Sequence, residues 1–198
     1  MSAKPKKIIV GISGASGAIY GQRLVDLLEK AECRIHLIVT IPARQILSDE
    51  LGVTELTVDR LLGRGSNLVE LHDNEEMICS LASGSFPVDA MAICPCSSHS
   101  VAAIAAGLAD TLLLRAAYVN LKQQRRLILV HREMPLTAMD LENMQRVVHA
   151  GGIICPASPA FYLAPETIHD LVDSVVGRVL DLLGVDHDLP IRWNPEPK

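Results

Sequence analysis

The chain has 198 residues, of which 49% are hydrophobic and 3% are aromatic, and a formal net charge of -5. This length suits a single domain over residues 1–198, in which we expect a flexible N-terminus over 1–6 and a C-terminal tail over 184–198. The acidic balance predicts no nucleic-acid or membrane partner, and the absence of a signal peptide or a long uncharged apolar stretch predicts a cytoplasmic protein.

The first predicted element is a strand over 8–12, which leads through a glycine-rich turn into a helix over 17–30. Gly14 and Gly17 let the backbone approach a ligand closely, and Ser16 adds a hydroxyl. The first N–H groups of a helix are unpaired and favour an anion, so the turn predicts a phosphate site. A tight turn packed for its own sake is the alternative interpretation.

The second predicted strand, over 35–39, ends at Thr40. A dinucleotide site needs an acidic residue there to hold a ribose diol, and a nucleoside-triphosphate loop needs Lys and then Ser or Thr after its last glycine. Neither pattern is present. The sequence therefore favours a ligand with one phosphate and no adenosine half, and FMN is the first candidate.

Apolar runs and helical patterns alternate along the rest of the chain. The predicted strands cover 90–94, 127–130 and 153–155, and the predicted helices cover 42–51, 100–107, 112–122, 140–150 and 167–183. This order predicts an α/β fold: a single-domain, doubly wound (Rossmann-like or flavodoxin-like), mostly parallel sheet with helices on both faces. Ligands of such sheets lie beyond the carboxyl ends of the strands, where the strand order reverses.

Four polar residues follow the predicted strand over 90–94, namely Ser97, Ser98, His99 and Ser100. Their hydroxyls and backbone amides come at a helix start, a position that suits an anion. One serine is expected to be an ordinary helix N-cap. Four polar groups in a row exceed what a cap requires, so we expect part of the ligand site here.

Cationic residues lie at the ends of two other predicted elements. Lys122 ends a helix, and Arg132-Glu133 follow the strand over 127–130. The pair is either a plain ion pair or a phosphate clamp with a proton carrier. Arg178 lies at the margin of the apolar stripe of the last helix, where its stem is partly buried and its guanidinium can reach an anion.

Aromatic residues are scarce, so Phe161, Tyr162 and Trp193 are candidates for contact with a flat ligand, with simple packing as the alternative. Five cysteines without a C-x-x-C pair predict reduced thiols. The seven histidines show no ligand spacing, so no metal site is predicted. The high aliphatic content predicts a homo-oligomer, because one small core cannot bury it all.

Short motifs extend over nearly the whole chain: Gly11-Ile-Ser-Gly-Ala-Ser-Gly-Ala-Ile-Tyr-Gly21, Ser83-Gly-Ser85, Cys94-Pro-Cys-Ser97, Leu114-Arg-Ala-Ala117, Leu121-Lys122, Arg132-Glu-Met-Pro-Leu136, Leu141-Glu-Asn-Met144, Pro159-Ala-Phe-Tyr162 and Ile191-Arg-Trp193. In these residues and their order the chain closely resembles the UbiX/Pad family of flavin prenyltransferases. It departs from the family pattern at Ser98-His99, at Tyr118 and at Leu163-Ala164.

The resemblance implies an activity and its partners. The family joins a dimethylallyl group from dimethylallyl monophosphate to N5 and C6 of reduced FMN, and the prenylated FMN serves a UbiD-type decarboxylase. It also implies a dodecamer. A flavin-dependent decarboxylase of cysteinyl peptides and a non-catalytic FMN carrier are the alternatives.

The resemblance also assigns residues. The FMN-binding positions are Gly14, Ala15, Ser16, Thr40, Ser97, Ser98, His99, Ser100 and Arg132. The positions that hold the prenyl phosphate are Lys122, Arg132, Tyr162 and Arg178. The catalytic positions are Ser16, Lys122, Glu133 and Trp193. Cationic side chains suit this chemistry, because the departing phosphate gains negative charge.

Overall fold

The computed structural model describes residues 5–191 and contains one six-stranded sheet in the order β3-β2-β1-β4-β5-β6. Every neighbouring pair is parallel. The strands are β1 (Lys7–Ile12), β2 (Arg34–Val39), β3 (Val69–His72), β4 (Ala90–Cys96), β5 (Arg126–His131) and β6 (Ile153–Ile154). The predicted doubly wound α/β fold is confirmed, and this strand order is the one found in Rossmann-type sheets.

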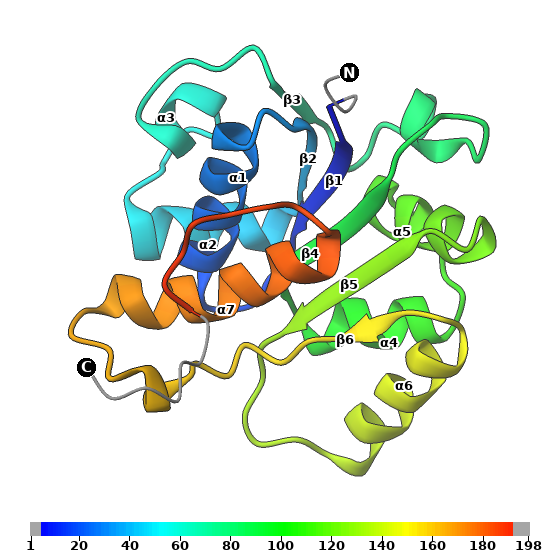
Figure 1. Cartoon of the computed structure of the whole chain (residues 1–198). Coiled ribbons are helices and arrows are strands. Elements are labelled where there is room, and N and C mark those ends of the chain that lie inside the picture. Colours follow the sequence, from blue (N-terminus) through cyan, green and yellow to red (C-terminus); the bar gives the residue numbers. More distant parts are fainter. Residues whose placement is uncertain (1–4, 192–198) are drawn as a thin grey trace.

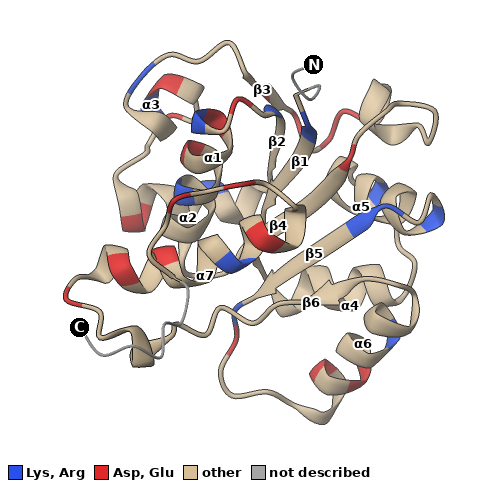
Figure 2. Ribbon diagram, in the orientation of Figure 1, with Lys and Arg blue, Asp and Glu red and all other residues tan. Residues whose placement is uncertain are grey.

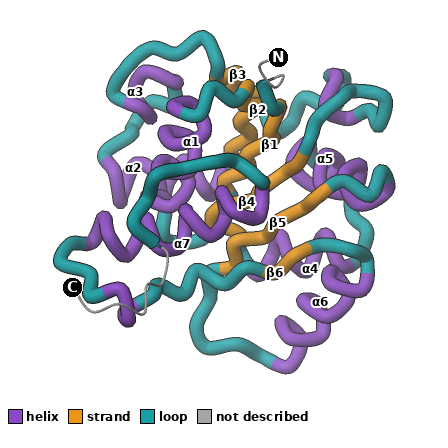
Figure 3. The backbone as a smooth tube through the Cα atoms, in the orientation of Figure 1, coloured by secondary structure: helices purple, strands orange, loops and turns teal. Residues whose placement is uncertain are grey.

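Helices cover both faces of the sheet (Figures 1 and 3). One face carries α1 (Ala18–Lys30), α2 (Ile41–Leu51) and α7 (Ile168–Leu183), with the short α3 (Val58–Leu62) beside α1. The other face carries α4 (Ser98–Ala105), α5 (Leu112–Lys122) and α6 (Ala138–His149). Two 3-10 turns, η1 (Ser80–Ala82) and η2 (Phe161–Leu163), complete the elements.

Strand side chains alternate between the two helical layers. Ile8 and Val10 of β1 pack with α1 and α7, whereas Ile9 packs with α5 and its neighbours. This alternation follows from the period of two in a strand, and burial on both faces explains why the central strands are apolar throughout. No helix within residues 5–191 is both long and apolar enough to cross a lipid bilayer.

Two predicted strand boundaries and one missing strand need correction. The strand β3 was not predicted, because Val69-Glu70-Leu71-His72 is short and half polar, as suits an edge strand. The strand β4 extends to Cys96 across a register shift, and β6 has only two residues. Within the N-terminal stretch that we expect to be flexible, Lys6 donates hydrogen bonds to the carbonyl oxygens of Leu183 and Gly184.

The strand order reverses beside β1, which pairs with β2 on one side and β4 on the other. Four helices that begin at this edge or near it have Thr or Ser N-caps, which are Thr40, Ser97, Thr111 and Thr137. The last helix begins with a capping box, in which Thr167 and Asp170 are bonded reciprocally. The carboxyl edge of the sheet is therefore ringed by capped helix starts.

Candidate active site

A buried serine joins the two central strands at the point where the order reverses. The Ser13 hydroxyl accepts a hydrogen bond from the Ser97 backbone N–H at 2.8 Å and donates to the Pro95 carbonyl at 3.2 Å. The Ser97 hydroxyl lies 3.1 Å from that of Ser100 and caps α4 by accepting from the Ser100 N–H. Sequence reasoning missed Ser13, although it lies within the glycine-rich motif. Its bonds fix the ends of β1 and β4 relative to each other.

A cavity of about 330 Å³, here called the first cavity, opens beside these serines. Five of the expected flavin-binding residues line it, which are Gly14, Thr40, Ser97, His99 and Ser100. Ile41, Pro42 and Leu114 add apolar walls, and Asn74, Glu75, Asp110 and Thr111 add polar ones. Ala15, Ser16, Ser98 and Arg132 are not among its lining residues. The structure thus brings part of the predicted set together around one space.

The first cavity fits a flavin with one phosphate. Thr40, Ser97 and Ser100 line it, and α4 begins at its wall with the positive end of its dipole. Gly14 lacks a side chain where a Cβ would approach Pro42 Cβ to 2.7 Å, so a larger residue would displace the wall. Glu75 and Asp110 would repel a phosphate, so the anionic end belongs near α4 and the flat apolar part near Leu114.

The start of α1 differs from the prediction of a free phosphate cradle. The Glu50 carboxylate accepts hydrogen bonds from the N–H groups of Gly17 (2.9 Å) and Ala18 (2.8 Å). This carboxylate supplies the negative charge that the helix start favours, because Gly17 itself offers no side-chain cap. Glu50 lies 33 residues along the chain, so no local pattern reveals the contact. A ligand phosphate must therefore use other donors than these two.

A histidine that sequence reasoning missed connects the cavity helix to the next strand. His131 ends β5 and is buried, and its Nε2 lies 3.0 Å from the Ser98 hydroxyl. Burial lowers the pKa of His131, while the carboxylates of Asp140 and Glu133 oppose this shift. The neutral ring can exchange a hydrogen bond with Ser98. The expected flavin residue Ser98 is thus bonded within the protein and holds α4 against β5.

A second cavity of about 450 Å³ lies between the segment after β6 and helix α7. Tyr162 and Arg178, both expected to hold the prenyl phosphate, line it together with Phe161 and Ser174. The Ser174 hydroxyl accepts from the Ala160 N–H at 3.1 Å and so fastens the segment to α7. Arg178 is 61% exposed, with Asp181 Oδ2 3.5 Å from its Nη1. Its guanidinium is therefore accessible to an anion.

Arg132 and Glu133 are exposed immediately after β5. The Arg132 N–H donates to the Cys96 carbonyl at 3.1 Å, which anchors the backbone next to β4. Burial raises the pKa of Tyr20, and the positive charge of Arg132 opposes that rise. Arg132 directly follows the carboxyl end of β5, and Arg178 lines the second cavity together with Cys155, which directly follows β6.

Lys122 does not share that edge within one chain. Helix α5 begins beside Asn74, whose carbonyl accepts from the Leu112 N–H, and it ends just before β5 begins. Ten steps of 1.5 Å put Lys122 about 15 Å further along the helix, at the opposite edge of the sheet. Figure 2 shows basic residues at both ends of β5. Within one chain Lys122 and Arg132 therefore lie at opposite edges of the sheet, and Trp193 lies outside the described residues.

The cysteines agree with the expectation of reduced thiols. All five lie within the described residues and are free. Burial raises the pKa of Cys94 and Cys96, which keeps both thiols protonated and unreactive at neutral pH. They act as small core residues at the end of β4.

Comparisons with known proteins find flavoproteins that are similar to this chain over nearly its whole length. The model of the Flavoprotein family matches residues 1–180. The flavin prenyltransferase UbiX of Methanothermobacter thermautotrophicus is 45% identical over 188 residues, which cover 95% of each chain. A crystal structure of AnUbiX (PadA1) in complex with FMN and dimethylallyl pyrophosphate is 36% identical, with a TM-score of 0.88 over 98% of this chain and 100% of that one. A dodecameric FMN-dependent UbiX-like decarboxylase from Escherichia coli O157:H7 is 39% identical, with a TM-score of 0.86 over 95% and 99%.

Proposed function

The chain belongs to the UbiX family of flavin prenyltransferases, and we propose that the first cavity holds FMN and that the second holds the phosphate end of a dimethylallyl donor. The observation that carries this assignment is the pairing of the two cavities at one sheet edge. One is lined by hydroxyls and a helix start, and the other is lined by an accessible arginine and tyrosine. Flavin and a small phosphate ester need these two environments.

The flavin is proposed to bind with its phosphate toward Ser97 and Ser100 and its ring system toward Leu114. When bound in reduced form, FMN supplies the nucleophilic positions that accept the prenyl group. The chain orients it through Gly14, which leaves room for close approach, and through Thr40, whose hydroxyl faces the cavity. His99 replaces the residue common in the family and lies on the wall, so it contacts the flavin directly.

The donor phosphate is proposed to bind to Arg178, Arg132 and Tyr162. Breaking the allylic C–O bond leaves the electron pair on the phosphate oxygen, and the two guanidiniums stabilise the charge that develops there. Arginine suits this task because its planar fork binds phosphate oxygens in pairs. AnUbiX was crystallised with the pyrophosphate, so both the monophosphate and the pyrophosphate belong in the assay.

Glu133 is proposed to remove the proton that ring closure at the flavin releases. It is exposed at the same strand end as Arg132, and its Oε1 accepts from the Met134 N–H at 3.1 Å. This bond orients the carboxylate while a second oxygen stays available. A carboxylate beside a phosphate clamp can also pass the proton on to the departing phosphate.

Lys122 is proposed to act on the cavities of a neighbouring copy. The related protein from Escherichia coli O157:H7 is dodecameric, which supports a homo-oligomer of this chain, the dodecamer included. Large apolar side chains are exposed on and beside α6, among them Met134 (87%), Met139 (70%) and Leu141 (56%), as suits a subunit contact. An interface of this kind can carry Lys122 of one copy to the carboxyl edge of another.

Subunit mixing tests the role of Lys122. Assemblies of Lys122→Ala alone and of Arg178→Ala alone are expected to have strongly reduced activity. If the two residues come from different copies, random mixed assemblies regain about a quarter of the wild-type sites. No recovery in mixed assemblies of confirmed composition would contradict this arrangement.

The activity is tested by anaerobic incubation with reduced FMN and dimethylallyl monophosphate, or in parallel with the pyrophosphate, followed by mass measurement of the flavin. The expected product is FMN with one additional C5 unit. Folded, FMN-loaded protein that leaves the flavin mass unchanged with both donors would reject the proposal. A non-catalytic carrier gives that negative result, and a cysteinyl-peptide decarboxylase instead releases CO2 from a peptide with a C-terminal cysteine. The use of the product by a UbiD-type decarboxylase is a further proposal that rests on the family resemblance.

A further inference from the structure

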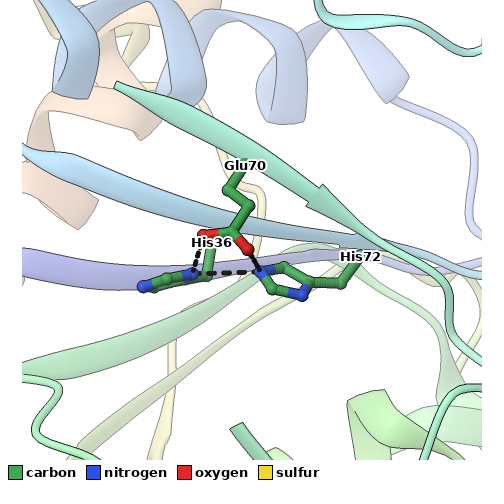
Figure 4. Close-up of side chains that lie close together, drawn as sticks. All are labelled: His36, Glu70 and His72. Carbon is green, nitrogen blue, oxygen red and sulfur yellow. Dashed lines mark hydrogen bonds and ion pairs between the residues drawn. The ribbon is translucent and has the colours of Figure 1, made fainter. Parts of the chain in front are cut away.

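Two histidines and a glutamate form a cluster on β2 and β3, away from the residues assigned above (Figure 4). His36 stands opposite Glu70 in the parallel register, and His72 follows two residues later, so all three side chains lie on one face of the sheet. Nδ1 of His36 lies 3.0 Å from Nε2 of His72. The two oxygens of Glu70 divide between them, with Oε2 3.4 Å from His36 and Oε1 3.7 Å from His72.

These separations match the edges of a metal coordination sphere. Zinc bonds to histidine nitrogen and carboxylate oxygen are about 2.0–2.2 Å long. In a tetrahedron with such bonds, neighbouring ligand atoms are about 3.3–3.6 Å apart. The two nitrogens lie 3.0 Å apart, and each lies 3.4 or 3.7 Å from its own oxygen of Glu70, so all of these separations lie close to this range. In Figure 4 one nitrogen of each imidazole and the carboxylate of Glu70 are turned toward one another.

The surroundings hold the two rings in place. The side chains of His36 and His72 are only 11% and 12% exposed. Each ring turns one nitrogen toward the cluster, Nδ1 for His36 and Nε2 for His72. Phe86 packs edge-on against His36 with the ring centroids 5.4 Å apart. Both ligand positions are thus fixed by strand backbone and packing before any ion arrives.

Glu70 supplies the negative charge of the cluster and lies on the side that is exposed to solvent. Its side chain is 67% exposed, so the cluster is reached from solvent on the carboxylate side. Lys7 and Arg34 line a neighbouring cavity of about 270 Å³ and add positive charge, which weakens cation binding but also disfavours protonation of His36. Two imidazole nitrogens and one carboxylate remain a set of donors that suits a divalent ion of intermediate softness.

We propose that His36, Glu70 and His72 bind a divalent transition-metal ion of the zinc class, with the fourth position open to water. Two histidines, one carboxylate and an open position form the donor set of many zinc sites. A bound ion joins the edge strand β3, which has only β2 as a neighbour, to the rest of the sheet. Local spacing does not reveal the site, because its ligands come from two adjacent strands. The site goes beyond the proposed prenyl transfer and does not depend on it.

The test uses the full-length chain without a histidine tag, treated with chelator and dialysed. Titration with zinc sulfate in a calorimeter is expected to give one saturable site per chain and a higher Tm. Cobalt(II) chloride is expected to give the visible absorption of a four-coordinate ion. The variants Glu70→Gln and His72→Gln are expected to weaken the apparent Kd at least about tenfold, since even outer-sphere changes weaken metal sites by that factor.

The matched controls are Glu55→Gln and His149→Gln, which change exposed residues outside the cluster and should leave the Kd unchanged. Circular dichroism checks that His72→Gln folds, and Glu70→Gln changes an exposed side chain that the fold does not need. Absence of saturable zinc binding by the wild-type chain would overturn the proposal and leave a hydrogen-bonded histidine pair. Equal affinities of wild type and Glu70→Gln would overturn it as well. None of these measurements depends on prenyl transfer.

Discussion

The two cavities at the carboxyl edge are built in different ways. The first is bounded by strand ends and helix N-caps, and its serines are bonded to one another and to the backbone within a buried network. The second is bounded by an irregular segment, and its functional side chains are exposed, with Tyr162 at 64% and Arg178 at 61%. Buried networks rigidify a site, whereas long exposed side chains must be ordered by their ligand.

This difference suggests a division of labour. In the proposed assignment, a single chain already contains a preorganised site for the flavin, but it supplies only part of the site where the prenyl group is transferred. Lys122 belongs to the opposite edge of the sheet, and the exposed side chains of the second cavity have little around them. Binding of flavin should therefore tolerate changes in the second cavity that abolish transfer.

The strongest test of this separation is Glu133→Gln, which keeps the size of the side chain and removes its basic oxygen. We expect kcat to fall about 10²- to 10⁴-fold, the range for loss of a positioned acid–base group. The Kd for FMN should remain unchanged, because Glu133 does not line the first cavity. Anaerobic product analysis and flavin titration measure the two quantities. Glu142→Gln on the exposed side of α6 is the control, and normal turnover of Glu133→Gln would remove Glu133 from proton transfer.

A second test removes the charge of the second cavity. Arg178→Ala should lower kcat/KM for the prenyl donor about 10²- to 10³-fold, because a donor to the developing phosphate charge is lost. Arg178→Lys keeps the charge without the planar fork and should recover only part of the loss. Arg60→Ala, at an exposed arginine of α3, serves as the matched control. An unchanged KM and kcat in Arg178→Ala would place the donor phosphate elsewhere.

A third test concerns the packing of α1 against the central strands at Gly21. A Cβ at this position would lie 2.4 Å from the Cys94 carbonyl oxygen and 3.0 Å from Ile12. Gly21→Ala must therefore push α1 away from β4, and we expect a loss of about 1–3 kcal/mol in the free energy of unfolding. Urea denaturation measures it. The control Gly65→Ala meets only an Asp59 oxygen at 3.5 Å, and equal stabilities of the two variants would show that α1 yields without cost.

Features with a local sequence signal could be predicted from the sequence, whereas contacts between residues far apart in the chain could not. Strands with continuous apolar runs and helix starts at Ser97 and Thr167 carry local signals, so the doubly wound sheet and the first cavity followed from them. The edge strand β3 lacks such a run. Contacts such as Glu50 with the start of α1, or Ser98 with His131, join residues 33 apart and become visible only after folding.

The position of Lys122 could have been predicted from the direction of the helix relative to the strands. A helix between two parallel strands must run back along the sheet, so its last residue lies at the edge where the next strand begins. Lys122 and Arg132 flank β5 and are therefore separated by its length. The family resemblance assigns both residues to one phosphate site without regard to this geometry, and the proposed contribution of Lys122 from a second copy would reconcile the two.

The smallest expected effect concerns His131, whose Nε2 lies 3.0 Å from the Ser98 hydroxyl and which directly precedes Arg132 in the chain. Its pKa is lowered in the folded chain by burial, against the opposing charges of Asp140 and Glu133. The unfolded chain therefore binds a proton at His131 more readily, and stability present above about pH 6.5 is lost as the pH falls through the folded value. One such group changes the free energy of unfolding by at most about 1.4 kcal/mol per pH unit. His131→Gln should flatten the decline between pH 7 and 5, as urea denaturation with chelator present can measure. If the free energy of unfolding falls equally with pH in this variant and in the wild type, the acid sensitivity belongs to other buried groups.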